Sequence, residues 1–131
     1  YEFADENGRG LGRIVRVPSV IDYKEALKNT TIFTSTVMFD LKQIPKEKLE
    51  MPLIKSEDTA LWWRVLRNGY TAYGLDENLV RYRRVGKSLS SNKFEAIRRI
   101  WNLYRKVEGL GFLESVWNFC FWAARAVLRR I

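Results

Sequence analysis

Histidine is missing from the sequence, and cysteine occurs only once. The first absence removes the commonest general base and the commonest zinc ligand, so acid–base chemistry must use Asp, Glu, Lys or Tyr. A single cysteine excludes an internal disulfide and a metal site of paired cysteines, which fits a reducing compartment. Because Cys120 lies in an apolar run, we expect it to be a small buried side chain.

Long apolar runs and targeting signals are missing as well. No segment reaches the roughly 18 consecutive apolar residues of a membrane-spanning helix. The chain starts at Tyr1 without a signal-peptide pattern, and we expect it to be a piece of a longer protein.

The residues that are present predict one basic domain. A length of 131 residues with 47% hydrophobic content is sufficient for one packed core. Lys and Arg total 23 against 15 acids, and the net charge of +8 favours an anionic partner such as nucleic acid, lipid headgroups or a phosphorylated substrate. Because no nucleic-acid fold signature accompanies the charge, we expect no nucleic-acid partner.

The N-terminal part of the chain predicts a hairpin, a helix and a strand. Residues 1–17 combine turn residues with the alternating segment RIVRV. Residues 22–29 predict a short helix that is capped by Asp22. Residues 31–39 are rich in β-branched and aromatic side chains and predict the best strand of the chain. Residues 40–55 contain two prolines and predict mostly loop.

A central helix is predicted over residues 57–67. Ser56 is the expected N-terminal cap, and Asn68-Gly69 is the expected left-handed end of the helix. Two short strands around a turn, followed by a loop, are predicted between residues 70 and 92.

Two helices are predicted at the C-terminal end. The first begins at Asn92, with Glu95 in the capping-box position. The second carries an apolar stripe at helical spacing, formed by Leu113, Val116, Trp117, Cys120, Ala124, Val127, Leu128 and Ile131. Other aromatic residues lie off this stripe and arginines follow it, which is typical of a helix at a membrane interface. A helix packed in a core or against a subunit has the same pattern, so both interpretations stay open.

Two adjacent acids, Glu57 and Asp58, begin the central helix. Acids are favoured near a helix N-terminus by the helix dipole, so an ordinary helix start is one interpretation. A catalytic base is the other. Because adjacent helical residues point in different directions, the two acids would divide roles. If Asp58 faces a cleft, we expect Glu57 to pair with a basic residue.

The same helix contains two adjacent tryptophans, Trp62 and Trp63. Each can be a core residue or a platform on which a sugar ring stacks, but one packing surface cannot bury both equally. The segment at 81–93 joins five cations to three serines and a glycine. It predicts either a phosphate-binding loop or a solvated loop that caps the next helix.

The order of these segments resembles the C-terminal half of bacterial family-2 glycosyltransferases, which have the GT-A fold and build capsule, O-antigen and teichoic-acid polymers. The resemblance covers about residues 1–108 and rests on NTTIFTSTVMFD, EDTALWWRVLRNGYTAYGLDENLVRYRR and GKSLSSNKFEAIRRIWNLYRK, in that order. It implies an α+β chain that forms an incomplete GT-A-like α/β fold, with a short mixed sheet, a central helix beginning with ED, and two C-terminal helices. Residues 1–108 would be the acceptor-side part of the glycosyltransferase domain, and residues 109–131 a C-terminal amphipathic helix.

The resemblance also implies a reaction and its residues. The reaction is inverting transfer of a sugar from a nucleotide-sugar to a glycan or lipid-linked acceptor in cell-surface polysaccharide synthesis. Asp58 is implied as the base that takes the proton from the acceptor hydroxyl, Glu57 as a residue that orients the site, and Trp62 as the border of the acceptor. The sugar pocket is implied to include Thr34, Ser35 and Thr36, and the nucleotide diphosphate is implied to lie near Arg83, Ser88 and Ser90.

Two departures from the family pattern stand out. Many relatives have a histidine after the YR pair that helps to bind metal, whereas Val85 stands near that position here. The nucleotide-binding half with its DxD motif is also missing. We therefore expect the Mg²⁺ or Mn²⁺ of the full-length enzyme to be held mostly outside this chain, and we assign no metal ligand within it. For the same reason we expect the isolated chain to be inactive and, because strand edges and apolar surface would be exposed, to self-associate.

A non-catalytic alternative is open at this point. A basic α+β module that docks on a membrane surface or an acidic partner would make Glu57-Asp58 only the start of a helix. For the enzyme, the resemblance implies a cytoplasmic location, peripheral on the inner face of the cell membrane. The aromatic and basic pattern of residues 111–131 would suit contact with that surface.

Overall fold

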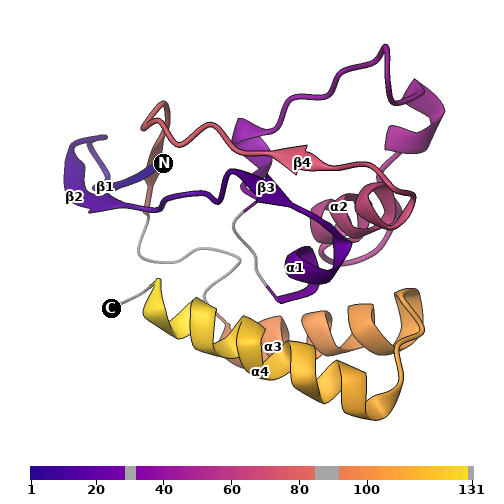
Figure 1. Cartoon of the computed structure of the whole chain (residues 1–131). Helices are drawn as coiled ribbons and strands as arrows, with labels where there is room; N and C mark the ends of the chain where they lie inside the picture. Colours follow the sequence, from indigo (N-terminus) through magenta and orange to yellow (C-terminus); the bar gives the residue numbers. More distant parts are fainter. Residues whose placement is uncertain (29–31, 85–91, 130–131) are drawn as a thin grey trace.

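The computed structural model describes residues 1–28, 32–84 and 92–129. The described chain has an α+β architecture, as predicted, with two small sheets and a set of short helices. The C-terminal helices α3 (Lys93–Asn102) and α4 (Phe112–Leu128) run side by side in opposite directions. They form a layer on one side of α1 (Tyr23–Lys28) and α2 (Glu57–Arg67), and the strands lie on the other side (Figure 1).

The first sheet has the strand order β2-β1-β5. Strand β1 (Glu2–Ala4) pairs antiparallel with β2 (Gly10–Ile14) and parallel with β5 (Arg81–Arg83). The hairpin predicted over residues 1–17 is therefore confirmed, although its second strand begins earlier than the RIVRV segment.

The second sheet consists of β3 (Val20–Ile21) and β4 (Ala72–Tyr73). The two strands predicted between residues 70 and 92 are thus present as β4 and β5. They do not pair with each other, because each has a partner from the N-terminal part of the chain.

Two helix starts are confirmed by their capping bonds. The Glu25 backbone N–H donates to Asp22 Oδ1 at 2.8 Å, which caps α1. The Glu95 backbone N–H donates to Asn92 Oδ1 at 3.2 Å, which caps α3. Beyond Asn102 the helix continues as a π-helical segment, η3 (Leu103–Val107).

The strand predicted at residues 31–39 is wrong. Within this segment, residues 32–39 are described and contain no strand but one 3₁₀ turn, η1 (Thr34–Thr36). The Thr36 hydroxyl donates to the Phe33 carbonyl at 2.7 Å, and the Thr34 hydroxyl donates to Asp58. Such side-chain bonds give a threonine-rich segment an alternative to a sheet ladder. Residues 40–55 are mostly loop, as predicted, with a second 3₁₀ turn, η2 (Lys46–Leu49).

Helix α2 has the predicted bounds but not the predicted cap. Ser56 is left-handed, with φ of 60°, and its side chain makes no capping bond. The predicted end is confirmed, because Gly69 has a φ of 93° and its N–H donates to the Leu66 carbonyl at 3.1 Å.

The two tryptophans of α2 are buried in two different clusters of apolar side chains. Trp63 is 1% exposed, belongs to the main core and stacks on Tyr104 with ring centroids 5.1 Å apart. Trp62 is 7% exposed and belongs to a second cluster with Ile44, Leu61 and Val65. One surface does not bury both rings, as the sequence predicted.

Helix α4 faces the core with the side that carries Ser115 and Asn118, and not with the predicted apolar stripe. Ser115 and Asn118 are buried, because their side chains bond to the Gly111 and Glu114 carbonyls of their own helix. Phe119 and Trp122 pack against the main core. The described members of the predicted stripe instead face solvent. Cys120 is exposed with them, so the prediction of a buried cysteine is wrong.

A buried carboxylate ties three elements together. The Tyr23 hydroxyl of α1 donates to Glu108 Oε2 at 2.5 Å, and Arg67 Nη1 of α2 lies 2.8 Å from the same atom. The Glu108 side chain, which follows η3, is fully buried. Burial and the Glu108 bond raise the pKa of Tyr23 above its usual value.

Above about pH 10 we expect the free energy of unfolding to fall as the pH rises. Burial raises the pKa of Tyr104, which is fully buried and donates its hydroxyl to the Leu27 carbonyl. The unfolded chain therefore releases this proton near pH 10 while the folded chain keeps it. The stability that Tyr104 contributes is complete below that pH and is lost as the pH rises toward the folded-state pKa, with a slope of about 1.4 kcal/mol per pH unit.

Denaturant titrations at about pH 9, 10 and 11 measure this slope. Tyr104→Phe should make the slope shallower, whereas Tyr73→Phe, which changes an 81% exposed ring, should leave it unchanged. An unchanged slope in Tyr104→Phe would contradict the assignment.

Candidate functional site

Asp58 lies in the first turn of α2 and is held by a residue far away in sequence. Its Oδ2 accepts a hydrogen bond of 2.7 Å from the Thr34 hydroxyl of η1, and its Oδ1 accepts one of 2.6 Å from the Thr59 backbone N–H. The side chain is half-buried and forms no ion pair within the described residues. Asp58 is therefore an oriented carboxylate that solvent can reach.

Glu57 takes no part in this arrangement among the described residues. It is exposed, and the ion pair predicted for it with a basic residue does not occur in the part of the chain that the structure describes. That prediction is wrong, because the side chain lies at the surface, where water solvates its charge.

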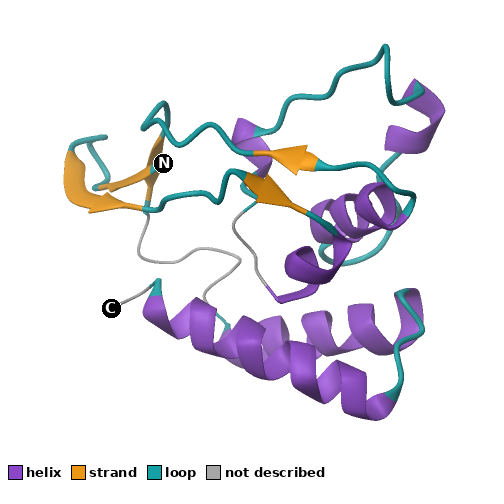
Figure 2. Ribbon diagram, in the orientation of Figure 1, coloured by secondary structure: helices purple, strands orange, loops and turns teal. Residues whose placement is uncertain are grey.

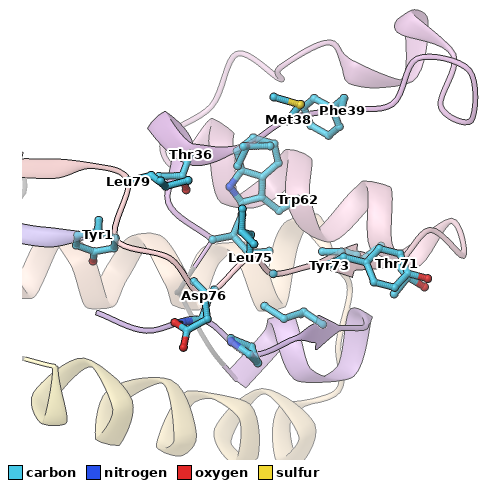
Figure 3. A pocket seen from close by; sticks show the side chains of 18 of the residues that line it. Tyr1, Thr36, Met38, Phe39, Trp62, Thr71, Tyr73, Leu75, Asp76 and Leu79 are labelled. Atoms are coloured by element: carbon cyan, nitrogen blue, oxygen red, sulfur yellow. The ribbon is translucent and has the colours of Figure 1, made fainter. Parts of the chain in front are cut away.

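Trp62 lies one helical turn after Asp58, on the same face of α2. Its ring packs against Phe39 at 5.7 Å, and its indole Nε1 is buried without a hydrogen-bond partner. Figure 3 shows Trp62 with Met38 and Phe39 to one side and Leu75 and Asp76 to the other. A buried N–H without an acceptor among the described residues is unfavourable, so this N–H contributes nothing to stability.

Trp62 and Thr36 line a cleft of about 890 Å³. Its wall combines apolar and aromatic side chains from α2, β4, η1 and the loops next to them. They include Ile32, Phe39, Val65, Tyr70 and Tyr73. Such a volume and lining suit a small organic ligand or a sugar unit. Asp58 itself is outside the lining, one turn from Trp62.

An ion pair stands at the border of the cleft. Arg16 Nη1 lies 2.8 Å from Asp76 Oδ2, and both residues line the cleft. The hydrogen bond from Arg16 lowers the pKa of Asp76 from its usual value. This carboxylate therefore keeps its negative charge, and the pair provides a fixed polar group opposite the aromatic wall.

The structure brings some of the predicted binding residues together. Thr34 contacts Asp58, Thr36 lines the cleft, and Ser35 is exposed between them. Arg83 lies on the edge strand β5, exposed. Its neighbour Tyr82 packs at 5.0 Å against Phe33, which precedes η1. Ser88 and Ser90 lie outside the described residues.

The sequence did not reveal the residues that shape the cleft. Phe39, Tyr70, Tyr73 and the Arg16–Asp76 pair come from segments up to 60 residues apart. No local pattern marks them, because they meet only through the pairing of β3 with β4 and the return of the 32–39 segment to α2.

Within residues 1–28, 32–84 and 92–129, no three Asp, Glu or Cys side chains lie close enough together to hold a metal ion. The expectation that metal ligands lie mostly outside this chain stays a prediction.

Comparison with known proteins gives a consistent group of relatives. TuaG of Bacillus subtilis, named as a candidate glycosyltransferase of teichuronic acid biosynthesis, is 39% identical over 132 residues, which is 100% of this chain and 52% of TuaG. An uncharacterized glycosyltransferase of Haemophilus influenzae is 29% identical over 130 residues, 98% of this chain and 51% of the relative. WfgD of Escherichia coli, a UDP-Glc:alpha-D-GlcNAc-diphosphoundecaprenol beta-1,3-glucosyltransferase, is 32% identical over 104 residues, 79% of this chain and 40% of WfgD.

The chain spans about half the length of the curated relatives it matches. No protein-family profile matches it, and no solved structure matches it at a significant level.

Proposed function

Because this chain is a homologue of bacterial glycosyltransferases along its whole length, we propose that it forms the acceptor-side half of an inverting, nucleotide-sugar-dependent enzyme. In this proposal it is the C-terminal half of a family-2 enzyme with the GT-A fold, and the remaining half binds the nucleotide. The full-length enzyme acts in the synthesis of a cell-surface polysaccharide.

The observation that carries the proposal is the position of Asp58. The carboxylate stands at the start of a helix, the Thr34 hydroxyl orients one of its oxygens, and Trp62 lies one turn further on the same face. A general base must reach the proton it removes and must be held in place by a rigid element. The bond from Thr34 and the position in the first turn of α2 hold Asp58 in place, and we propose that the acceptor hydroxyl reaches it from the cleft beside Trp62.

The proposed reaction is a direct displacement. Asp58 accepts the proton of the acceptor hydroxyl as its oxygen attacks the anomeric carbon of the donor sugar. The bond from that carbon to the nucleoside diphosphate breaks on the opposite side, so the configuration at the carbon inverts. Glu57 is proposed to influence the site through its charge in the same helical turn.

The cleft beside Trp62 is proposed to bind the acceptor. The indole ring lies in the wall of the cleft and supplies apolar surface for a sugar face. Two relatives from Escherichia coli, WfgD and WfaP, are named for transfer to GlcNAc-diphosphoundecaprenol. We propose a lipid-linked glycan as acceptor here too, which places the enzyme on the inner face of the cell membrane.

The donor is proposed to bind at the other edge of the site. Thr34, Ser35 and Thr36 would border the transferred sugar, and Arg83 with Ser88 and Ser90 would face the diphosphate. Arginine suits this role because its guanidinium can bind a phosphate through two parallel hydrogen bonds. A Mg²⁺ or Mn²⁺ ion held by the nucleotide-binding half would neutralise charge on the leaving diphosphate.

Replacing Thr34 with Val in the full-length enzyme tests the proposal at its positioning residue. Valine keeps the shape but removes the hydroxyl that holds Asp58, so we expect kcat to fall by about tenfold, the equivalent of one hydrogen bond to a charged group. The fall in kcat should exceed any change in the KM for the nucleotide-sugar, whose sugar Thr34 is proposed to border. Steady-state transfer assays measure both constants.

Ser19→Ala is a suitable control, because Ser19 is an exposed hydroxyl residue in the loop before β3. It should leave both constants unchanged. An unaltered kcat in Thr34→Val would argue against Asp58 as the oriented base.

A further inference from the structure

Helix α4 presents an uninterrupted apolar surface to solvent. Its outer face, as we define it, consists of Leu113, Val116, Trp117, Cys120, Ala124, Val127 and Leu128, all of which are exposed. Leu113 is 82% exposed, Trp117 61% and Leu128 70%. A soluble helix normally turns such a stripe inward, so an outward stripe of this length marks an interaction surface.

The neighbouring helix extends this surface. The Trp101 ring of α3 contacts Phe112 and Phe119 of α4, each with centroids 6.0 Å apart. Phe94 lies two turns before Trp101 and is 85% exposed. Figure 2 shows that the α3–α4 layer lies on the side of the molecule away from the strands. None of the described residues that line the cleft belongs to α3 or α4, so the outer face can be occupied while the cleft stays open.

Cations border the outer face. On the side where α1 packs, Lys28 Nζ lies 5.5 Å from the centroid of the Phe121 ring. Lys28 and Arg125 share a single carboxylate, Glu25, at 3.4 Å and 3.6 Å. Two cations against one acid leave this border positive. At the other end, near the start of α4, Arg105 donates to the Leu110 carbonyl.

We propose that the outer face of α4 lies on the surface of an anionic lipid bilayer, with the helix axis parallel to the membrane plane. The helix has 17 residues, and no helix in the described part of the chain is long and apolar enough to cross a membrane. An apolar face with Trp and Phe and a basic border is the pattern of a helix that lies within the headgroup region.

Charge selects the bilayer over a second copy of the chain. Two copies that each carry +8 repel one another at this basic-bordered face, whereas anionic headgroups attract the same charge; the self-association expected of the isolated chain would use its strand edges instead. The inference also rests on the proposed function, because an enzyme that uses a lipid-linked acceptor must work at the bilayer.

The single cysteine supplies the test. Cys120 is exposed in the middle of the outer face, so a polarity-sensitive dye can be attached there without other changes to the chain. On addition of vesicles of phosphatidylcholine and phosphatidylglycerol, we expect the dye emission to shift to the blue. Brominated lipids should quench it, and binding should weaken with phosphatidylcholine alone or at high salt.

A set of variants distinguishes binding through the outer face from non-specific hydrophobic binding. Leu113→Asn and Trp117→Asn should each weaken vesicle binding by about tenfold or more, because each removes a large apolar side chain from the buried surface. Leu53→Asn and Met38→Asn change apolar side chains that are equally exposed but lie outside α3 and α4, and they should bind as the wild type does.

Three outcomes would overturn the inference. The dye on the folded chain does not respond to anionic vesicles. The outer-face variants bind as tightly as the controls. The dye emission is already shifted to the blue without lipid, because a second copy or the other half of the full-length enzyme covers α4. Sedimentation then shows whether a dimer is present. The last outcome would assign the face to a protein contact instead.

Membrane binding and the catalytic proposal can be tested separately. Asp58→Asn should leave vesicle binding unchanged. Leu113→Asn should leave transfer to a water-soluble acceptor unchanged in the full-length enzyme. Retained transfer in Asp58→Asn would therefore count against the catalytic proposal alone, and retained vesicle binding in Leu113→Asn would count against the membrane proposal alone.

Discussion

Replacing Asp58 with Asn in the full-length enzyme should lower kcat by about 10²–10⁴-fold, the usual contribution of a general base. Asparagine keeps the size of the side chain, and its amide oxygen can still accept the bond from Thr34. The amide cannot take up the proton of the acceptor hydroxyl. The Kd of the nucleotide-sugar should stay within about twofold, because Asp58 is not proposed to contact the nucleotide. Transfer assays and calorimetric titration with the donor measure the two quantities.

Glu57→Gln is the matched control for this substitution. It removes the same charge from the same helical turn, so it changes the helix-dipole contribution in the same way, by about 0.3–1 kcal/mol. Because Glu57 is exposed and makes no bond to η1 in the described chain, we expect its kcat to fall by less than about tenfold, within the range of an indirect electrostatic effect. Retained turnover in Asp58→Asn would refute the assignment of the base.

Replacing Trp63 with Ala should cost about 3–5 kcal/mol of unfolding free energy, the range for the loss of a large buried aromatic side chain. The ring is 1% exposed and stacks on Tyr104, and its Nε1 donates to the Ala26 carbonyl at 3.1 Å. Its removal leaves a cavity between α1, α2 and η3 and an unpaired buried carbonyl. Denaturant unfolding followed by circular dichroism measures the loss.

Two conservative variants distinguish the contribution of Trp63 from that of Trp62. Trp63→Phe removes the indole N–H from a bonded, buried site and should cost about 1–3 kcal/mol. Trp62→Phe removes an N–H that has no partner and should cost less than about 1 kcal/mol. In the full-length enzyme, Trp62→Phe should raise the KM for the acceptor instead. Equal losses of stability in the two variants would contradict the division of roles between the rings.

Features that depend on neighbouring residues were predictable from the sequence. Asp22 and Asn92 cap helices because their side chains reach a backbone N–H three residues away. Gly69 ends α2 because glycine adopts a left-handed conformation at low cost. Residues 31–39 failed as a strand because β-propensity describes a segment that has a partner, and the hydroxyls of Thr34 and Thr36 bond elsewhere.

The direction of α4 was beyond the reach of periodicity. Helical spacing identifies an apolar stripe but does not tell which side meets the core when both sides are apolar. The core side contains Ser115 and Asn118, whose polar groups bond within the helix and so cost little to bury.

The candidate site shows the same limit. The spacing of Asp58 and Trp62 places them on one helical face, and this follows from sequence alone. The bond from Thr34 to Asp58 spans 24 residues, and no spacing rule indicates it. The resemblance to glycosyltransferases named Thr34 as a sugar-pocket residue, and the structure adds its contact with the carboxylate.

The adjacent tryptophans of α2, which belong to two different clusters, have a consequence for how the proposed enzyme can diversify. The ring that holds the scaffold together and the ring that meets the cleft are consecutive residues, yet they share no neighbours in the two core clusters except Ile32. Side chains around Trp62 can therefore be exchanged as a group while the stack of Trp63 on Tyr104 is preserved. On the proposal that Trp62 borders the acceptor, a new sugar preference would arise on this helix without a new fold to support it.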